Sequence, residues 1–205
     1  MAVLTSSATE DVPGPQPSIT DAPEPEERRL LAAARAGDRQ AYGQLIARHQ
    51  EVAFRAAFLI TGSAADAEEA AQEAFLKAWL ALDRFRASAP FRPWLVRIAI
   101  NEARNRRRGA GRRGGLALRL EHELTSSHAA SAEDQAFAAA ERARLVAALG
   151  HLGEDDQLVI AARHLLGLSE VETAAALRIR PGTVKSRLSR ALGRLRSELE
   201  NDGAR

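Results

Sequence analysis

Apolar residues recur every three or four positions along most of this chain, which is the spacing of amphipathic helices. The spacing predicts helices between residues 27 and 62, from about Ser63 to Leu82, from Trp94 to about Arg108, and from about Ala132 to Glu200 with breaks at glycines. No segment has the alternation of apolar and polar residues that is typical of a strand. The sequence therefore predicts an all-α fold.

Segments without helical periodicity divide the chain into two small helical domains. Residues 1–26 are rich in proline and acid, so we expect a disordered tail. Residues 109–134 contain glycine, arginine and serine without a sustained pattern, so we expect a flexible linker between domains at 27–108 and 135–200. Residues 201–205 would form a short tail.

Polar residues mark several expected helix starts. Asp38 follows Ala36-Gly37 and can cap a helix, and Ser63 with Asp66 has the spacing of a capping box. Ser169 with Glu172 has the same spacing and opens a short helix that a three-residue link, residues 178–180, joins to a second, basic helix. This order of elements is typical of a helix-turn-helix, whose second helix enters the major groove of DNA.

The basic helix expected from Pro181 has two different sides. Its apolar arc consists of Val184, Leu188, Ala191, Leu192, Leu195 and Leu199, and the opposite side carries Gly182, Ser186, Ser189, Arg190 and Gly193. Small residues let the backbone approach a duplex, while Lys185, Arg187 and Arg190 can reach phosphates or guanine edges. A solvated basic face is the alternative for this helix taken alone.

The formal net charge of +2 hides a segregation of charge along the chain. Residues 1–27 carry six acids and no Lys or Arg, whereas residues 84–119 carry eleven arginines against Glu102, a net charge of +10. Residues 178–196 carry seven basic residues and no acid. Two separate cationic blocks indicate a polyanionic partner, for which nucleic acid is the leading candidate.

The helix expected after Pro93 carries a polar stripe. Arginines and asparagines share one side of it: Arg97, Asn101, Arg104, Asn105 and Arg108. Aromatic residues stand at or just before its start: Phe85, Phe91 and Trp94. The combination suits base contacts and stacking against unpaired bases. The alternative is that the aromatic residues belong to the core, which we favour for Phe91.

Composition narrows the remaining functions. The chain has no cysteine, and its five histidines lack metal-ligand spacing, so we expect neither a metal site nor a cofactor. There is no glycine-rich phosphate loop or other catalytic constellation, so we do not expect an enzyme. No apolar run is long enough for membrane insertion and the N-terminus is unlike a signal peptide, so we expect a cytoplasmic protein.

Three segments together resemble the extracytoplasmic-function (ECF) sigma factors of the sigma-70 family. They are "DAEEAAQEAFLKAW" at 66–79, "FRASAPFRPWLVRIAINEARNRRR" at 85–108 and "LSEVETAAALRIRPGTVKSRLSRALGRLR" at 168–196. The resemblance implies a first domain that binds core RNA polymerase and reads the −10 promoter element, and a last domain that reads the −35 element. It also implies an anti-sigma factor as a further partner.

The resemblance assigns roles to particular residues. Polymerase binding falls to Asp66, Glu69, Gln72 and Glu73, of which the three acids share one side of a helix. The resemblance assigns binding of the −10 DNA to the loop residues Arg84, Phe85, Arg86, Ala87 and Ser88 and to the helix from Trp94 to Arg108 described above. The −35 DNA falls to Gly182, Thr183, Lys185, Ser186, Ser189 and Arg190, with Arg187 alongside.

One departure and two alternatives accompany this interpretation. The family usually has glycine in the helix-turn-helix link where this chain has Arg178, so we expect an unfavourable backbone conformation there. A helix-turn-helix repressor or activator that binds duplex DNA as a dimer, without a polymerase partner, is the main alternative function. An anti-terminator-like RNA-binding protein is a weaker one, since it would not need the C-terminal helix-turn-helix.

Overall fold

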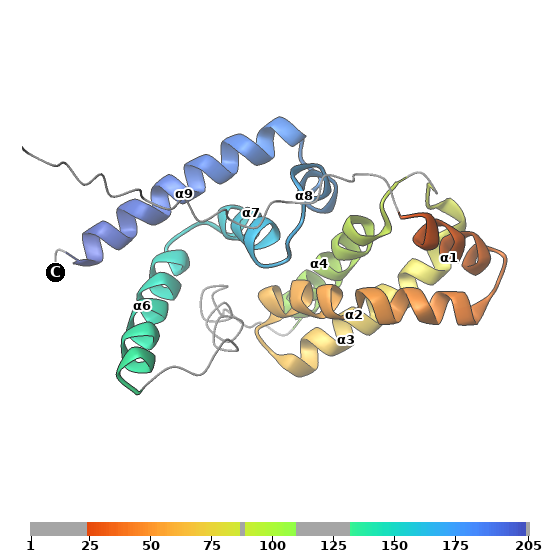
Figure 1. The fold of residues 1–205 in the computed structure, drawn as a ribbon, viewed down its shortest axis with the longest axis horizontal. Coiled ribbons are helices and arrows are strands. Elements are labelled where there is room, and N and C mark those ends of the chain that lie inside the picture. The colour runs from red at the N-terminus through yellow and green to blue at the C-terminus, as the bar shows by residue number, and fades with distance from the viewer. Residues whose placement is uncertain (1–23, 87–88, 110–131, 204–205) are drawn as a thin grey trace, which may run out of the picture.

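The computed structural model describes residues 24–86, 89–109 and 132–203, and all regular structure in these ranges is helical (Figure 1). The N-terminal helices are α1 (Pro25–Arg35), α2 (Arg39–Thr61), α3 (Ala64–Ala81) and α4 (Phe91–Gly109), with a 3-10 turn at Leu82–Arg84. The C-terminal helices are α6 (Ala132–Gly150), α7 (Glu154–His164), α8 (Glu170–Leu177) and α9 (Pro181–Gly203). The all-α prediction is confirmed.

The N-terminal helices pack around one side of α4. Phe91 and Leu95 of α4 are fully buried, as are Leu31 of α1 and Leu45 of α2. Burying each such side chain contributes about 1.5–3 kcal/mol relative to leaving it in water. The apolar side of α4 is therefore fixed by the hydrophobic effect, and its polar side is left for other contacts.

The expected caps form. The Asp38 carboxylate accepts hydrogen bonds from the backbone N–H groups of Gln40 and Ala41, at 2.8 and 3.1 Å, and so starts α2. Ser169 and Glu172 make both bonds of a capping box at the start of α8, at 3.1 and 2.8 Å. Local sequence thus sets these helix starts, as predicted.

Several helix ends differ from the predicted ones. Helix α4 begins at Phe91 rather than Trp94, because Pro93 falls in the first turn, where a missing N–H costs no hydrogen bond. Helix α1 begins at Pro25 for the same reason, and α9 runs to Gly203 beyond the expected end at Glu200. Most of the expected tail at 1–26 and of the expected linker at 109–134 lies outside the described residues, as do Ala87, Ser88 and residues 204–205.

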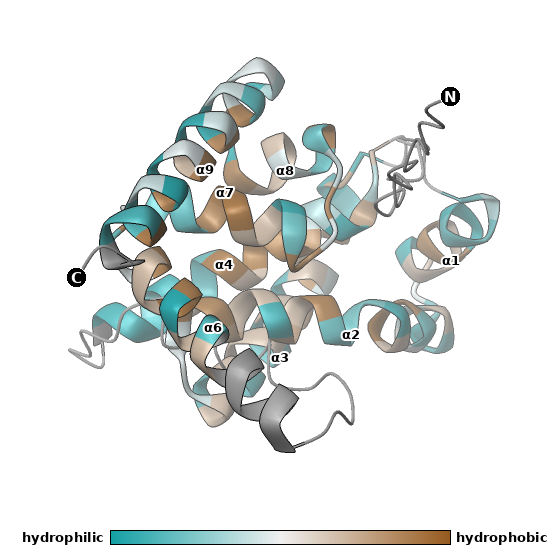
Figure 2. Ribbon diagram, turned by 60° about the vertical axis from the view of Figure 1, so that its left-hand side comes forward, coloured by the Kyte–Doolittle hydropathy of each residue, from teal (hydrophilic) through white to brown (hydrophobic). Residues whose placement is uncertain are grey.

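The C-terminal helices place α8 and α9 as a helix-turn-helix against α7. Val184, Ala191 and Leu195 of α9 are buried as expected. Leu192, which the sequence assigned to the same arc, is 39% exposed because it lies at the edge of that arc. In Figure 2 the apolar faces of α2, α4 and α7 turn toward the interior.

The two groups of helices touch through α4 and α8 (Figure 1). A hydrophobic cluster continues across this contact, from Val96 and Ile100 of α4 to Leu158 of α7 and Ala174 of α8. Apolar residues of α4 therefore take part in the contact with the C-terminal helices.

Arg178 ends α8 in the left-handed region, with φ 57° and ψ 42°, as the link sequence led us to expect. Replacing it with glycine should raise the free energy of unfolding of the C-terminal helices by about 1 kcal/mol, since glycine adopts this conformation without strain. Urea unfolding would measure the change. Arg178→Ala is the matched control because it removes the charge but keeps the strain, and equal stability of the two variants would contradict the prediction.

Candidate nucleic-acid interface

Helix α9 presents the face that the sequence assigned to the −35 element. Its backbone is reachable at Gly182, and the side chains of Lys185, Ser186, Ser189 and Arg190 are exposed. Thr183 and Arg187 are half-buried at the edge of this face. The side chain of Arg190 lies along the helix, where its Nε donates to the backbone oxygen of Ser186 at 3.2 Å. The structure thus brings five of the seven residues to one exposed side of α9, whereas Arg187 turns toward Asp155 of α7.

Helix α4 carries the polar stripe assigned to the −10 element. Asn101, Asn105 and Arg108 are exposed, whereas Arg97 and Arg104 are half-buried. Burial lowers the pKa of Arg97, and repulsion from Arg178 of α8 lowers it further. The last turn also holds Arg106 and Arg107, which sequence reasoning did not single out although they complete a run of three arginines. This cationic run at a helix C-terminus is favoured by the helix dipole.

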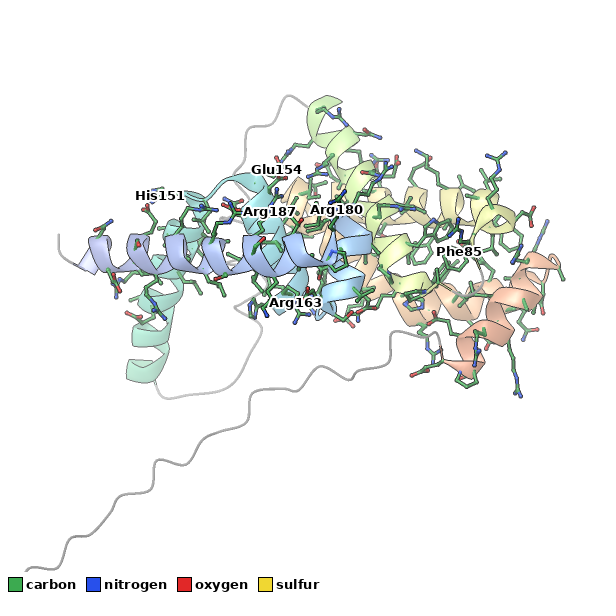
Figure 3. All side chains as sticks on the ribbon, turned by 90° about the horizontal axis from the view of Figure 1, so that it is seen from above. Phe85, His151, Glu154, Arg163, Arg180 and Arg187 are labelled. Carbon is green, nitrogen blue, oxygen red and sulfur yellow. The ribbon has the colours of Figure 1, made fainter. Side chains whose placement is uncertain are left out.

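A cavity of about 310 Å³ lies where the 3-10 turn meets the start of α4. Its walls include Arg84, Arg86 and Trp94 of the expected −10 surface, and Ala175 of α8 closes one side. Phe85 also lines the cavity, but its side chain is only 5% exposed (Figure 3). Its ring packs on that of Trp94, with centroids 4.7 Å apart, and meets the ring of Phe91 edge-on. Phe85 therefore supports the pocket wall from the core rather than projecting from a loop.

The acidic ridge of α3 is present and extends further than the sequence analysis recognised. Glu69 and Gln72 are exposed, and Asp66 and Glu73 are half-buried. On the same side lie Leu76 and Leu80, which are 53% and 74% exposed. The signal was available in the sequence, because Glu69, Glu73, Leu76 and Leu80 recur at the alternating four- and three-residue spacing of one helix side. We call these six residues the α3 ridge.

Ion pairs tie the α3 ridge to α4. Lys77 donates to Glu102 of α4 at 2.6 Å and lies 3.6 Å from Glu73. The hydrogen bond to Glu102, against a smaller opposing effect of burial, raises the pKa of Lys77. Arg106 of α4 pairs with Glu69. These pairs are partly or largely exposed, so they fix orientation more than they stabilise the fold.

The first turn of α7 contacts both basic helices. Glu154 accepts hydrogen bonds from Arg104 Nε at 3.2 Å and Arg107 Nη2 at 2.7 Å. Asp155 lies 2.9 Å from Arg187 of α9, and Asp156 pairs with Arg194 of the same helix. Figure 3 labels Glu154 and Arg187, which both lie in this region. We call Glu154, Asp155 and Asp156 the acidic turn.

Burial raises the pKa of Glu154, but its hydrogen bonds and attraction to Arg107 and Arg104 outweigh this effect, so the pKa is below its ordinary value. A carboxyl group with a lowered pKa in the folded state stabilises that state at neutral pH. The contribution is present above the ordinary carboxyl pKa and is lost as the pH falls through the lowered value. The pairing is therefore intact at neutral pH.

Arg92, in the first turn of α4, makes a second contact between the two groups of helices. Its guanidinium donates to the backbone oxygen of Leu166 and, at 3.4 Å, to that of Gly167. It also lies 3.9 Å from Glu172 of the α8 capping box. Sequence reasoning missed Arg92, because its partners are backbone carbonyls that only the fold brings within reach.

Within the described ranges, no three His, Cys, Asp or Glu side chains are grouped so that they could hold a metal ion. None of the described helices is both long and apolar enough to cross a membrane.

The chain matches two family models and several characterised proteins. The model of sigma-70 region 2 matches residues 45–113, and that of sigma-70 region 4 matches residues 142–195. The RNA polymerase sigma factor CnrH of Cupriavidus metallidurans is 34% identical over 88% of this chain and 97% of its own length. The ECF RNA polymerase sigma-E factor of Escherichia coli is 34% identical over 79% of this chain and 88% of its own length.

A solved structure of CnrH, in complex with the cytosolic domain of CnrY, is similar to this fold. It shares 31% identity, with a TM-score of 0.63, over 86% of this chain and 99% of that one. The chain belongs to the ECF sigma factors of the sigma-70 family. Its relatives are regulators of transcription initiation, and the dimeric repressor considered above has no support among them.

Removing the charge of Glu154 should loosen the contact between the two groups of helices. Glu154→Gln loses two charge-assisted hydrogen bonds that are partly exposed, together contributing roughly 1 kcal/mol. Small-angle scattering at low salt should show a larger mean radius of gyration, and the difference from wild type should shrink at high salt. Asp155→Asn is the control, because its partner lies within the C-terminal helices. An unchanged radius for Glu154→Gln at low salt would contradict the prediction.

Proposed function

We propose that this sigma factor directs core RNA polymerase to promoters through three surfaces of the described fold. The α3 ridge binds core polymerase, the polar stripe of α4 with the adjoining cavity reads the −10 element, and the exposed face of α9 reads the −35 element. The domain boundaries follow from these roles, with the N-terminal unit at 27–108 and the C-terminal unit at 135–200.

One observation carries the proposal. The α3 ridge and the α4 stripe belong to the same packed unit yet differ in chemistry, since the ridge is acidic and apolar and the stripe is cationic. An acidic surface repels DNA, whereas exposed leucines beside acids suit a protein that presents basic and apolar groups. A protein whose only partner is DNA does not need an exposed surface that is acidic and apolar. A sigma factor needs both surfaces at once.

The proposal gives the α4 stripe a role in strand opening. Arg97, Asn101 and Arg104 face the side from which melted DNA would approach, and Trp94 offers a ring for stacking. In the present arrangement Arg104 is not free for a ligand because its Nε donates to Glu154, and Ala175 of α8 forms one side of the cavity. DNA therefore binds this surface after α7 and α8 have moved away from α4.

Further properties follow from the same role. The chain acts in the cytoplasm, where polymerase and chromosome are, and it has no catalytic activity of its own. We infer that it also binds an anti-sigma factor, because the similar CnrH was solved with the cytosolic domain of CnrY. Run-off transcription of genomic DNA with purified core polymerase tests the function directly, and absence of any chain-dependent transcript would refute it.

Substitution on α9 tests the −35 surface. Lys185→Ala should weaken binding to a promoter recovered from the run-off experiment by about 1–3 kcal/mol if Lys185 reads a base, and by less if it contacts phosphate alone. In the phosphate case the salt dependence of binding should become shallower. Arg196→Ala is the control, since it removes an exposed charge farther along the same helix. Equal effects of the two substitutions would remove the assignment.

Substitution on α3 tests the polymerase surface. Leu80→Ser should reduce co-purification with core polymerase, because it removes the most exposed apolar group of the α3 ridge. The free energy of unfolding should change by about 0.5 kcal/mol or less, as is usual at an exposed site. Val171→Ser, on α8, is the control for losing an exposed aliphatic side chain. Normal polymerase binding by Leu80→Ser would count against the ridge.

A further inference from the structure

Glu27 is an acidic residue in the interior of the N-terminal helices. It is 9% exposed although it lies in the first turn of α1, where its neighbours Glu24 and Glu26 are exposed and pair with Arg48. A buried carboxylate is costly unless it is hydrogen-bonded or paired. The partners of Glu27 therefore indicate what it does.

Glu27 reaches across to the beginning of α4. Its Oε1 accepts a hydrogen bond from the backbone N–H of Phe91, the first residue of that helix, at 3.3 Å. The first N–H groups of a helix have no partner within the helix, and a carboxylate there is also favoured by the helix dipole. A residue 64 positions away in sequence thus supplies the cap of α4.

His49 of α2 lies beside the other oxygen of the same carboxylate. Its Nε2 lies 3.4 Å from Glu27 Oε2, without hydrogen-bond geometry and without another hydrogen-bond partner, and its ring packs on Phe91 at 5.4 Å. Burial raises the pKa of Glu27, but the interactions with His49, the Phe91 N–H and Arg48 outweigh it, so the pKa lies below its ordinary value. Glu27 therefore stays charged at neutral pH.

The helix start that Glu27 caps adjoins the cavity of the −10 surface. Phe91 contacts Trp94 with ring centroids 5.6 Å apart, and Phe85 edge-on at 5.8 Å. Trp94 and Phe85 are walls of the cavity. A shift of the first turn of α4 would move both rings, because Phe91 is packed against each of them.

We propose that Glu27 is a positioning residue for −10 recognition: together with His49 it fixes the first turn of α4 and thereby the aromatic wall against which an unpaired base packs. The proposal rests on the proposed −10 role of this surface. It assigns α1 a part in promoter opening, although α1 contributes no residue to the cavity.

The test uses holoenzyme assembled from the full chain and core polymerase, on a promoter recovered by run-off transcription. Glu27→Ala should reduce permanganate-detected opening around −10 by about fivefold, since loss of a helix cap is of that order. Glu27→Gln should restore most of the opening, because an amide oxygen can still accept from the Phe91 N–H. Glu26→Ala, which removes an exposed acid from the neighbouring position, should behave like wild type.

Two further measurements distinguish a role of Glu27 in positioning the cavity wall from a role in the stability of the whole fold. Co-purification with core polymerase should be unchanged in Glu27→Ala, since the α3 ridge lies away from the cap. In a Trp79→Phe background, where Trp94 is the remaining tryptophan, Glu27→Ala should increase quenching of its fluorescence by acrylamide. If Glu27→Ala does not fold, Glu27→Asp takes its place, because its shorter side chain keeps the charge but cannot span both partners.

Particular outcomes overturn the proposal. Normal promoter opening by the Glu27 variant would overturn it. A parallel loss of polymerase binding and promoter opening would also overturn it, because Glu27 would then stabilise the whole fold and not the cavity wall in particular. Unaltered Trp94 quenching would likewise overturn it. If wild-type holoenzyme itself produces no permanganate-reactive thymines, it is the proposed function that fails, and the Trp94 measurement still judges whether Glu27 positions the cavity wall.

Discussion

Three consecutive acids at the start of α7 connect the two basic elements of this chain. Acids are favoured there for a local reason, since free N–H groups and the helix dipole attract negative charge. The fold gives the same charges a second use: Glu154 turns to α4, while Asp155 and Asp156 turn to α9. Two cationic surfaces that would repel each other thereby lie on either side of one short anionic segment. This neutralisation acts together with the hydrophobic cluster that α4 shares with α7 and α8.

The contacts around α4 are of two physical kinds. Toward α1, α2 and α3 it buries Phe91, Leu95 and Ala99 completely, and such packing involves no charges that salt can screen. Toward α7 and α8 a smaller apolar contact is supplemented by Arg92, Arg104 and Arg107, whose partners are carbonyls and carboxylates near the surface. Water and phosphate can replace such partners. The helix thus makes apolar, buried contacts on the side that builds the domain, and polar contacts that other partners can replace on the side to which we assign DNA binding.

Periodicity and caps were sufficient to predict the helices, because these depend on neighbouring residues. Asp38, Ser169 and the strained Arg178 are examples, since each acts within a few positions of itself. The exposed faces of α3 and α9 were predictable for the same reason. Glu27, Arg92 and Glu154 were not, because their hydrogen-bond partners lie from 47 to 75 positions away. The start of α4 was misplaced for this reason too, since its cap comes from another helix.

Arg178 also lies close enough to Arg97 to repel it across the contact between α4 and α8. The closed arrangement therefore contains an unfavourable pair of like charges beside the favourable pairs of the acidic turn. Repulsion of this kind lowers the free energy by which the described arrangement is favoured over one in which α4 and α8 are apart, and each 1.4 kcal/mol changes the ratio of two such forms about tenfold. A ligand that prefers one form by a modest margin then redistributes the whole population. Sensitivity to partners is in this sense built into the placement of a single arginine.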